Sequence, residues 1–281
     1  MSHQLIIRET CFQWGQKTYI MGVLNVTPDS FSDGGLFNNT EAALTQAQAM
    51  VKAGGDIIDI GGQSTRPGAE QVSLTEELNR VLSVLEVIRP KINIPISVDT
   101  TRSEVAKAAI EAGADIVNDI SGGTFDQKML STVGKLDVPI MLMHIRGTPT
   151  TMQQLTNYEN LMGEISDFLS QQIKTAMTAG ISKHKIIIDP GIGFAKNFEQ
   201  NLEIIRKLPQ LKKLGCPILV GASRKSFIGK ILNQSEPQAR VWGTAAACCA
   251  AICSGADLLR VHDVAEMRDV ALVADAIYRH D

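Results

Sequence analysis

The chain has no excess of positive charge and no apolar run long enough to cross a membrane. Its 281 residues include 27 Lys and Arg and 30 Asp and Glu, which give a net charge of −3. This balance excludes a protein that binds nucleic acid through a large excess of positive charge. Any anionic ligand must therefore bind at a local cluster of Lys and Arg. The most apolar stretch, Val241 to Cys253, falls short of the roughly 20 residues of a membrane helix. We expect no nucleic-acid partner and no membrane span.

An export signal and paired cysteines are also missing. The chain starts MSHQLIIRET, without the basic region and apolar core of a signal peptide, so we expect a cytoplasmic protein. Its five cysteines are an odd number with no CxxC pair, which indicates reduced core residues. Cys249 and Cys253 share a helical face and are an alternative pair of metal ligands, but no His or acid lies at ligand spacing.

Several common catalytic motifs are absent as well. GIGFAK lacks the third Gly of a dinucleotide fingerprint, and GASRKS lacks the Gly-Lys-Ser/Thr ending of a P-loop. Neither HExxH nor GxSxG occurs in the sequence. The sequence therefore gives no indication of NAD, ATP, a catalytic zinc or an acyl-transfer serine.

Eight short apolar runs are the main structural signal. They are Tyr19 to Leu24, Ile57 to Ile60, Ile94 to Val98, Ile116 to Val117, Val138 to Met143, Lys185 to Ile188, Pro217 to Val220 and Leu258 to Val261. They lack apolar-polar alternation, which is typical of parallel strands buried on both faces. Stretches with helical spacing separate them. Eight β-then-α units without a linker predict one domain over 1–281, a (β/α)8 TIM barrel, with an open doubly wound sheet as the alternative.

Helix start and stop signals favour the same order of elements. A capping residue precedes Glu or Gln by three positions in Ser73 with Glu76, Thr101 with Glu104, Thr124 with Gln127, Ser235 with Gln238, and Asp263 with Glu266. AGGDIIDI, AGADIVND and SGADLLRV each place a Gly and an Asp before a strand, as a helix ending in a left-handed Gly requires. Residues 3–18 are predicted to form an N-terminal β-hairpin that turns at WGQK and covers the barrel floor.

Polar residues follow nearly every predicted strand. In chain order they are Asn25, GGQSTRPG from Gly61, Asp99, Asn118 with Asp119, His144 with Arg146, Asp189, GASRKS from Gly221, and Arg260 with His262. A single polar residue often only caps or turns the chain, and Asp189 in Asp-Pro-Gly fits that explanation by itself. Because barrels carry their chemistry at the carboxyl ends of the strands, we expect Asp99, Asn118, Asp189 and Lys225 to converge on one mouth.

Six longer segments identify a family. They are MGVLNVTPDSFSDGG from Met21, GGQSTRPG from Gly61, LMHIRGTPTTMQ from Leu142, DPGIGFAK from Asp189, GASRKSFIG from Gly221 and RVHDV from Arg260. Together they resemble the dihydropteroate synthases over residues 5–275. The resemblance implies a transferase of folate biosynthesis that joins 6-hydroxymethyl-7,8-dihydropterin diphosphate to 4-aminobenzoate, giving 7,8-dihydropteroate and pyrophosphate.

The resemblance also implies which residues meet the two ring systems. Asp189, Asn118 and Asp99 would bind the donor and acceptor edge of the pterin, because a buried carboxylate can accept two parallel N–H groups. Lys225 would reach both the pterin and the aminobenzoate, although by itself it fits a solvated lysine equally well. The aminobenzoate region would include Thr65, Pro67, Phe194 as an apolar wall, Lys225, and Ser226 near a helix start that favours an anion.

The diphosphate would meet polar and cationic residues at other strand ends. These are Asn25, Thr65, Arg66, Arg260 and His262. Arg260 has an alternative explanation as the ion-pair partner of a helix acid. Asn25 would meet Mg²⁺, the one implied cofactor, which would arrive with the diphosphate because one amide oxygen cannot hold it alone. Two Gly-bearing segments, Thr27 to Asn39 and Gln63 to Gln71, are expected to be flexible loops that close over the mouth.

No side chain is needed as a base, because an arylamine is mostly unprotonated at neutral pH. Positioning and leaving-group stabilisation should therefore dominate, with Asp99, Asp189, Lys225 and Arg260 as catalytic residues. We expect acids on one side of the pocket and cations on the other. This expectation motivates a dissociative path, in which Asp99 and Asp189 meet positive charge on the pterin methylene carbon.

Two other functions match part of the pattern. The complete amino-terminal loop and the SRKS segment disfavour a pterin-dependent methyltransferase barrel, and the full set of charged site residues disfavours a non-catalytic paralogue acting as a partner subunit. Departures from the family are small, with Gln63 where many relatives have Glu and Ala195 in place of a frequent Gly. The segment from Tyr158 to Glu164 is less typical, and the role of its acids stays open.

The family's habit of pairing through late helices implies a homodimer. The stretch from Gly243 to Gly255, rich in Ala, Cys and Gly, allows a close approach to another helix. Packing within the barrel explains the same composition.

Overall fold

Eight parallel strands form the centre of the molecule in the computed structural model, which describes residues 4–26, 36–65, 68 and 71–279, with 36–39 as backbone only. The strands are β3 (Tyr19–Asn25), β4 (Ile57–Gly61), β5 (Ile96–Asp99), β6 (Ile116–Asp119), β7 (Ile140–Met143), β8 (Ile186–Asp189), β9 (Leu219–Val220) and β10 (Leu258–Val261). They pair in the order β8-β7-β6-β5-β4-β3-β10-β9, and a parallel bridge from Ile188 to Ile218 closes the ring. The predicted barrel is confirmed, and the open-sheet alternative is wrong.

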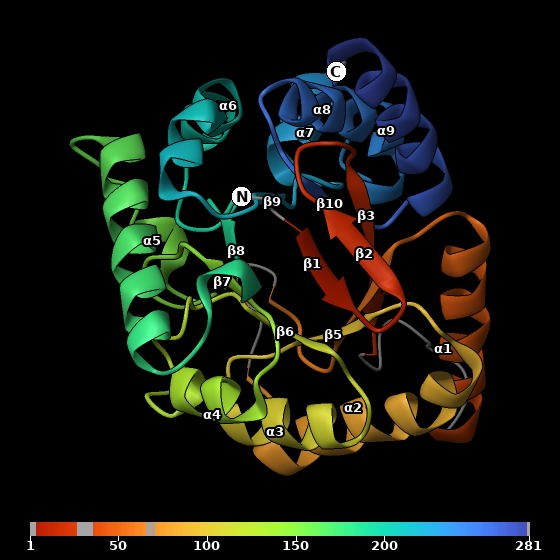
Figure 1. Ribbon diagram of the computed structural model, residues 1–281. Helices are drawn as coiled ribbons and strands as arrows, with labels where there is room; N and C mark the ends of the chain where they lie inside the picture. Colours follow the sequence, from red (N-terminus) through yellow and green to blue (C-terminus); the bar gives the residue numbers. More distant parts are fainter. Residues whose placement is uncertain (1–3, 27–35, 66–67, 69–70, 280–281) are drawn as a thin grey trace.

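Helices surround the ring of strands (Figure 1). In the described residues they are α1 (Leu36–Lys52), α2 (Leu74–Ile88), α3 (Ser103–Glu111), α4 (Met129–Leu136), α5 (Leu161–Thr178), α6 (Phe198–Lys207), α7 (Ser226–Leu232), α8 (Val241–Cys253) and α9 (Val264–Tyr278). β4, β7 and β8 are buried along their whole length. Helices cover the outer face and side chains fill the inner face, which explains why the apolar runs show no alternation.

A two-stranded hairpin covers the floor of the barrel, as predicted. β1 (Gln4–Ile7) pairs antiparallel with β2 (Thr10–Gln13) and lies in front of the ring in Figure 1. Its buried side chains share one apolar cluster with residues at or near the amino ends of the barrel strands: Leu5, Ile7 and Phe12 with Tyr19, Met21, Ile57, Ile116, Met141, Ile187, Leu219 and Leu258. The hairpin thus closes the end of the barrel opposite the strand carboxyl ends.

The turn of this hairpin differs from the prediction. The chain reverses at Arg8 and Glu9, because Ile7 pairs directly with Thr10, and WGQK instead joins β2 to β3. Arg8 has a positive φ of 55°, and its Nε lies 2.5 Å from the carboxylate of Asp115. The turn at Arg8 thus has no Gly or Asn in its local sequence to predict it. It is accompanied instead by the contact with the distant Asp115.

The three Gly-Asp turns are confirmed and have a common hydrogen-bond pattern. Gly54, Gly113 and Gly255 have φ values of +86°, +105° and +92°, in the left-handed region that Gly adopts without strain. The Asp two residues after each Gly forms two hydrogen bonds with one residue in, or directly before, a neighbouring strand. The Asp N–H donates to the backbone carbonyl of that residue, and the Asp carboxylate accepts its backbone N–H. The pairs are Asp56 with Ile20, Asp115 with Ile96 and Asp257 with Ile218.

Only one of the five predicted helix caps forms the expected bond. Ser73 Oγ accepts the N–H of Glu76 at 3.2 Å and caps α2. The cap predictions for Thr101, Thr124, Ser235 and Asp263 are wrong, because none of these side chains caps a helix N-terminus. At α3, the carboxylate of Asp126 from the next loop accepts the N–H of Ser103 at 2.7 Å.

Two further expectations need correction. All five cysteines are free, but Cys11 and Cys253 are exposed rather than in the core. Of the expected loop from Thr27 to Asn39, residues 27–35 lie outside the described residues, and 36–39 belong to α1. In the described part of the chain, no helix combines the length and the apolar character needed to cross a membrane.

Candidate active site

The carboxyl ends of four neighbouring strands place polar residues in one row. The register pairs Asn25 of β3 with Gly61 of β4, Gly61 with Asp99 of β5, and Asp99 with Asn118 of β6. A Cβ added to Gly61 would lie 3.7 Å from Asn25 Oδ1 and 3.8 Å from Asp99 Oδ2. Because Gly61 has no side chain, the amide of Asn25 and the carboxylate of Asp99 face the same space.

Arg260 of β10 lies among the acids of this mouth. Its Nε donates to Asp59 Oδ2 at 2.6 Å, and its Nη2 donates to Asp99 Oδ2 at 2.7 Å. Asp59 is fully buried and Asp99 is 5% exposed. Arg260 is thus an ion-pair partner, but of two strand acids rather than a helix acid. The expected separation of acids from cations is wrong, because Arg260 lies between the carboxylates of Asp59 and Asp99 and pairs with both.

Burial shifts the protonation of the two acids predicted to be catalytic. Burial raises the pKa of Asp99 to about 7; Arg260 opposes this effect, and the carboxylate of Asp59 adds to it. Burial also raises the pKa of Asp189 of β8. The N–H of Gly191, which donates to Asp189 at 2.7 Å, and the charge of Lys225 both lower this pKa. A ligand that donates hydrogen bonds to these oxygens would favour their ionised forms.

Lys225 precedes α7 and reaches across to the loop after β8. Its Nζ lies 4.2 Å from the ring centroid of Phe194, a cation-π distance. Burial, with the charge of Arg260, lowers the pKa of Lys225 to about 8, although Asp189 and Asp99 raise it. Lys225 is therefore not a freely solvated lysine, and it joins Phe194 to the same mouth.

The remaining predicted residues after β9 and β10 lie nearby. His262 Nδ1 is 3.0 Å from Ser223 Oγ, and the backbone N–H of His262 donates to the same hydroxyl. Burial, with Arg260 and Arg224, lowers the pKa of His262 to about 3, so the ring is neutral near pH 7. Ser226 is the first residue of α7 and is exposed.

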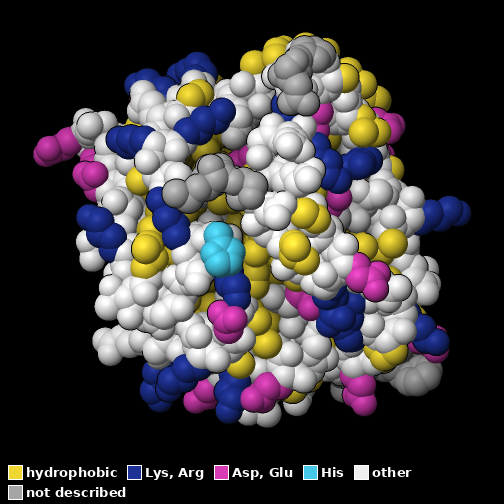
Figure 2. Space-filling model, viewed as in Figure 1, with side chains coloured by type: hydrophobic (Ala, Val, Ile, Leu, Met, Phe, Trp, Pro, Cys, Tyr) yellow, Lys and Arg dark blue, Asp and Glu magenta, His cyan; other side chains and the backbone are white. Residues whose placement is uncertain are grey.

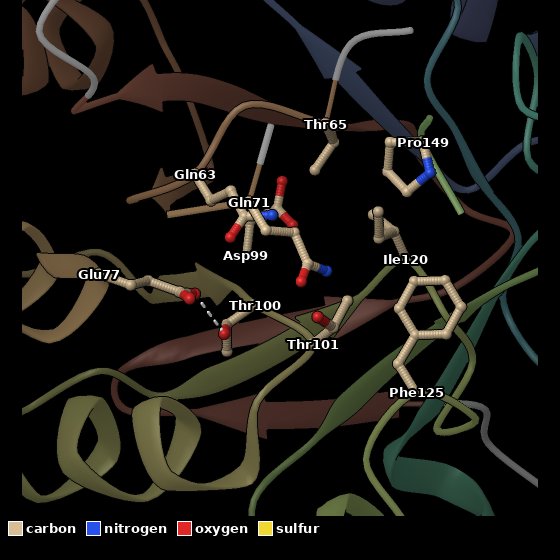
Figure 3. A pocket seen from close by; sticks show the side chains of 10 residues that line it. All are labelled: Gln63, Thr65, Gln71, Glu77, Asp99, Thr100, Thr101, Ile120, Phe125 and Pro149. Atoms are coloured by element: carbon tan, nitrogen blue, oxygen red, sulfur yellow. Dashed lines mark hydrogen bonds between the residues drawn. The ribbon is translucent and has the colours of Figure 1, made fainter. Parts of the chain in front are cut away.

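A cleft opens beside Asp99 (Figure 3). It is lined by Gln63, Thr65, Gln71, Glu77, Asp99, Thr100, Thr101, Ile120, Phe125 and Pro149. Thr65 therefore lies at the same mouth as Asp99. In the same lining, the hydroxyl of Thr100 donates to Glu77 at 2.6 Å. Arg66 and Pro67, which the sequence also assigned to this region, lie outside the described residues.

A buried Lys-His pair behind Asp189 was missed from the sequence. Lys196 Nζ lies 2.8 Å from His144 Nδ1 and donates to His144 O at 3.2 Å, while the backbone N–H of His144 donates to Asp189 O at 2.9 Å. Burial lowers the pKa of Lys196 well below its ordinary value and that of His144 to about 2. DPGIGFAK contains this lysine, but only the barrel brings it to His144.

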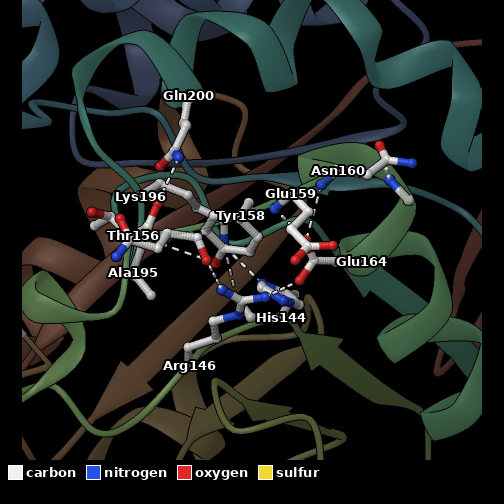
Figure 4. A network of polar contacts seen from close by, with 12 residues as sticks. His144, Arg146, Thr156, Tyr158, Glu159, Asn160, Glu164, Ala195, Lys196 and Gln200 are labelled. Carbon is white, nitrogen blue, oxygen red and sulfur yellow. Dashed lines mark hydrogen bonds and ion pairs between the residues drawn. The ribbon is translucent and has the colours of Figure 1, made fainter.

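A second network, around Arg146, holds the same loop (Figure 4). The guanidinium of Arg146 lies 3.7 Å from the ring centroid of Tyr158 and pairs with Glu164. The Tyr158 hydroxyl donates to the carbonyl of Ala195 at 3.0 Å. Ala195 has a φ of 51°, a conformation that favours Gly. The two networks together hold the end of β8, which carries Asp189, and the loop after it, which carries Phe194. Glu164 thus gains a structural role.

Comparisons with known proteins test the family resemblance found in the sequence. The family described as pterin binding enzyme matches residues 21–262. A protein named dihydropteroate synthase from Synechocystis is 58% identical over 275 residues, which are 98% of this chain and 95% of that protein. The Clostridium difficile dihydropteroate synthase, crystallised in the presence of pteroic acid, has a TM-score of 0.91 at 48% identity and covers 96% of this chain and 100% of its own.

A third comparison gives the same result with a different ligand. The Xanthomonas albilineans dihydropteroate synthase with 4-aminobenzoic acid has a TM-score of 0.92 at 40% identity, over 100% of both chains. High identity across nearly the whole length of both chains, together with the family match, leaves one assignment. This chain belongs to the dihydropteroate synthase family of pterin-binding enzymes.

Proposed function

We propose that this chain is a transferase of folate biosynthesis. It joins 6-hydroxymethyl-7,8-dihydropterin diphosphate to 4-aminobenzoate and releases 7,8-dihydropteroate and pyrophosphate. The observation that carries this proposal is the convergence of Asp99, Asn118, Asp189, Lys225 and Arg260 at one barrel mouth, in a chain 58% identical to a dihydropteroate synthase. The complete set of charged residues disfavours the non-catalytic alternative, and the relatives disfavour the methyltransferase.

The pterin edge is assigned to Asp189, Asn118, Asp99 and Lys225. One oxygen of Asp189 accepts the N–H of Gly191, which leaves the other for a ligand. Asn118 donates its Nδ2 to Asp59 at 3.2 Å, so its carbonyl oxygen is the end available to a ligand N–H. Hydrogen bonds to charged groups contribute roughly 1.5–3 kcal/mol each, and a heterocycle without matching donors would leave buried oxygens unpaired.

The aminobenzoate is assigned to Thr65, Pro67, Phe194, Lys225 and Ser226. The ammonium of Lys225 over the ring of Phe194 places a cation beside an apolar face. This combination suits an aromatic ring that carries a carboxylate. Thr65 lines the adjoining cleft, and Ser226 starts α7.

The diphosphate is assigned to Asn25, Thr65, Arg66, Arg260 and His262. Among the described residues, none accepts a hydrogen bond from Nη1 of Arg260, while its Nε and Nη2 are held by two acids. The guanidinium is thereby fixed and keeps donors for an oxyanion. A neutral His262 can add one further hydrogen bond.

Mg²⁺ is proposed to accompany the diphosphate and to meet Asn25. Mg²⁺ prefers oxygen ligands and keeps several waters. Asn25 Oδ1 and Asp99 Oδ2 face the space above Gly61, and the described residues include no group of three or more His, Cys, Asp or Glu able to hold a metal. These residues fit an ion that the substrate carries, and that ion would neutralise charge on the leaving diphosphate.

The chain's own residues then position the reactants. The arylamine nitrogen bonds to the pterin methylene carbon as the bond from that carbon to the diphosphate oxygen breaks; pyrophosphate leaves with the electron pair, and the surplus proton of the nitrogen passes to solvent rather than to a protein base. The two networks behind Asp189 hold the loop after β8 that carries Phe194. Asp189 forms no ion pair with any described residue, so its charge remains available to a ligand or to a developing cation. Asp99 and Asp59 both pair with Arg260. An anion that binds Arg260 would therefore also change how strongly Arg260 stabilises the ionised form of Asp99.

The protein is further proposed to act in the cytoplasm as a homodimer. Free cysteines are typical of a reducing compartment. Exposed apolar side chains occur on the neighbouring helices α8 and α9: Trp242, Leu272, Val273 and Ile277 are 78%, 54%, 62% and 55% exposed. Hydrophobic side chains gather along that edge of the molecule (Figure 2). Light scattering should give twice the chain mass of 30.4 kDa, and a monomer mass would contradict the dimer.

The function is tested by product analysis. Purified protein is supplied with the pterin diphosphate, 4-aminobenzoate and Mg²⁺, and dihydropteroate is measured by mass spectrometry while each component is omitted in turn. Product that depends on all three is expected. No product would favour the partner-subunit alternative, and transfer of a methyl group from a folate would favour the methyltransferase.

A further inference from the structure

Asp59 of β4 lies one layer below the mouth and was not among the residues predicted from the sequence. It is fully buried. Its carboxylate accepts three hydrogen bonds: from the hydroxyl of Ser97, from Asn118 Nδ2 at 3.2 Å and from Arg260 Nε at 2.6 Å. Two of these donors belong to residues assigned to the substrate. Asp59 therefore contacts the binding residues without reaching the mouth itself.

The contact with Asn118 determines which end of its amide faces the mouth. An ionised carboxylate only accepts hydrogen bonds, so the amide nitrogen must face Asp59. The carbonyl oxygen of Asn118 is then left without a donor among the described residues. A neutral side chain with both a donor and an acceptor at position 59 would allow either orientation of this amide.

The contact with Arg260 fixes the guanidinium in a similar way. Asp59 holds Nε, Asp99 holds Nη2, and the two bonds define the plane of the group. A planar guanidinium held at two positions has fixed directions for its remaining N–H groups. One buried carboxylate thus orients both a ring-binding and a diphosphate-binding residue.

We propose that Asp59 is a positioning residue that sets the polarity of the mouth, with an acceptor oxygen on Asn118 and donors on Arg260. This arrangement selects a heterocycle whose edge donates hydrogen bonds and whose tail is anionic. The inference rests on the proposed function, in which Asn118 binds the pterin edge.

The test uses 6-hydroxymethylpterin, which lacks the diphosphate and so reports on Asn118 separately from Arg260. Calorimetric affinity is compared for the wild type, Asp59→Asn, and the exchange variant Asp59→Asn with Asn118→Asp. Asp59→Asn should bind at least about tenfold more weakly, because the Asn118 amide no longer has one fixed orientation. In the exchange, the amide introduced at 59 donates to the carboxylate introduced at 118, whose other oxygen faces the mouth. The exchange should recover at least about tenfold over Asp59→Asn.

Ser97→Ala is the matched control, because it removes the third hydrogen bond of Asp59 without touching Asn118 or Arg260. Its affinity should stay within about twofold of the wild type. In steady-state assays, Asp59→Asn should raise KM for the pterin substrate and leave KM for 4-aminobenzoate unchanged. A purely structural defect would move both constants together.

The inference is overturned if folded Asp59→Asn binds as tightly as the wild type, or if the folded exchange variant binds no better than Asp59→Asn. Should Asp59→Asn fail to fold, the exchange variant decides alone, and loss of binding in its folded form overturns the inference. A wild type that does not bind 6-hydroxymethylpterin, or an Asn118→Ala variant that binds it normally, refutes the proposed function of the site as well. Thermal unfolding followed by circular dichroism establishes which variants are folded.

Discussion

Replacing Arg260 by Met removes the cation that two buried carboxylates share. Met retains much of the apolar stem, so the main loss is the guanidinium that bonds to Asp59 and Asp99. Removing one partner of a buried ion pair typically costs about 3–5 kcal/mol, because the other charge stays buried. We expect the free energy of unfolding at pH 6 to fall by about 3 kcal/mol, chiefly through the stranded Asp59.

Asp99 makes the decrease in the free energy of unfolding of Arg260→Met larger at high pH. Its pKa is raised from the ordinary 3.8 to about 7 by burial, although Arg260 lowers it, so without Arg260 it rises further. A raised pKa favours the protonated folded protein, and this stabilisation is lost as the pH rises through the folded pKa. At pH 6, which is below this pKa, Asp99 is mostly protonated in both proteins. Above pH 7 the variant alone continues to lose stability, by about 1.4 kcal/mol per unit. At pH 8.5 the total deficit should therefore reach about 5 kcal/mol.

Guanidinium chloride unfolding at pH 6 and pH 8.5, followed by circular dichroism, measures both parts of this deficit. Arg268→Met is the control, because Arg268 has a similar exposure of 25% against 22% but lies 3.6 Å from the partly exposed Asp56. It should cost less than about 1 kcal/mol, without a trend between the two pH values. An Arg260→Met deficit that is equal at both pH values, or no larger than the control, would refute the shared ion pair.

Four further outcomes follow from the site. Asp99→Asn should lower kcat more than it weakens pterin affinity, because the charge is needed mainly in the transition state; an unchanged kcat would argue against that role. Lys225→Ala should lower kcat/KM by about 10- to 100-fold without unfolding the chain, and a normal kcat/KM would remove Lys225 from the site. Arg260→Ala should weaken calorimetric pyrophosphate binding, and an unchanged affinity would disprove its diphosphate role. His144→Asn keeps an acceptor for Lys196 but cannot take a proton. Burial lowers the pKa of His144 from 6.5 to about 2, so its stabilising effect is present above pH 6.5 and is lost as the pH falls. From pH 6.5 to 5 the variant should lose about 2 kcal/mol less stability than the wild type in urea unfolding, and parallel pH profiles would contradict this.

The barrel itself could be predicted because its signals are local. Each strand lies between helices and the barrel interior, so it appears as a short apolar run wherever it falls in the chain. Gly54, Gly113 and Gly255 were identifiable because a helix that turns sharply into a strand needs a left-handed residue. The position of the site followed from the fold, since parallel strands bring their carboxyl ends to one mouth.

Elements that depend on distant partners could not be predicted. The hairpin turns at Arg8, whose ion pair with Asp115 joins residues 107 positions apart. The N-terminus of α3 is capped by Asp126 from another loop, so the capping pattern at Thr101 was misleading. Local pattern rules cannot detect a partner that only the closed barrel supplies.

The same limit applied within the site. Strand-end positions identified Asp99, Asn118 and Arg260, but the register of the barrel decides which acid meets which base. Asp59 lies inside an apolar run, where nothing marks it as the partner of Arg260, 201 residues away. His144 and Lys196 likewise occur in two separate motifs, and only their burial together shows that they support Asp189.

A crystal structure of the protein with 6-hydroxymethylpterin diphosphate and Mg²⁺ tests the central claim most directly. The account predicts the nitrogen edge of the ring within hydrogen-bond distance of Asp189 and Asn118, and the diphosphate within reach of Arg260 and His262. A heterocycle bound away from Asp189, or a diphosphate that leaves Arg260 in contact only with Asp59 and Asp99, would contradict it.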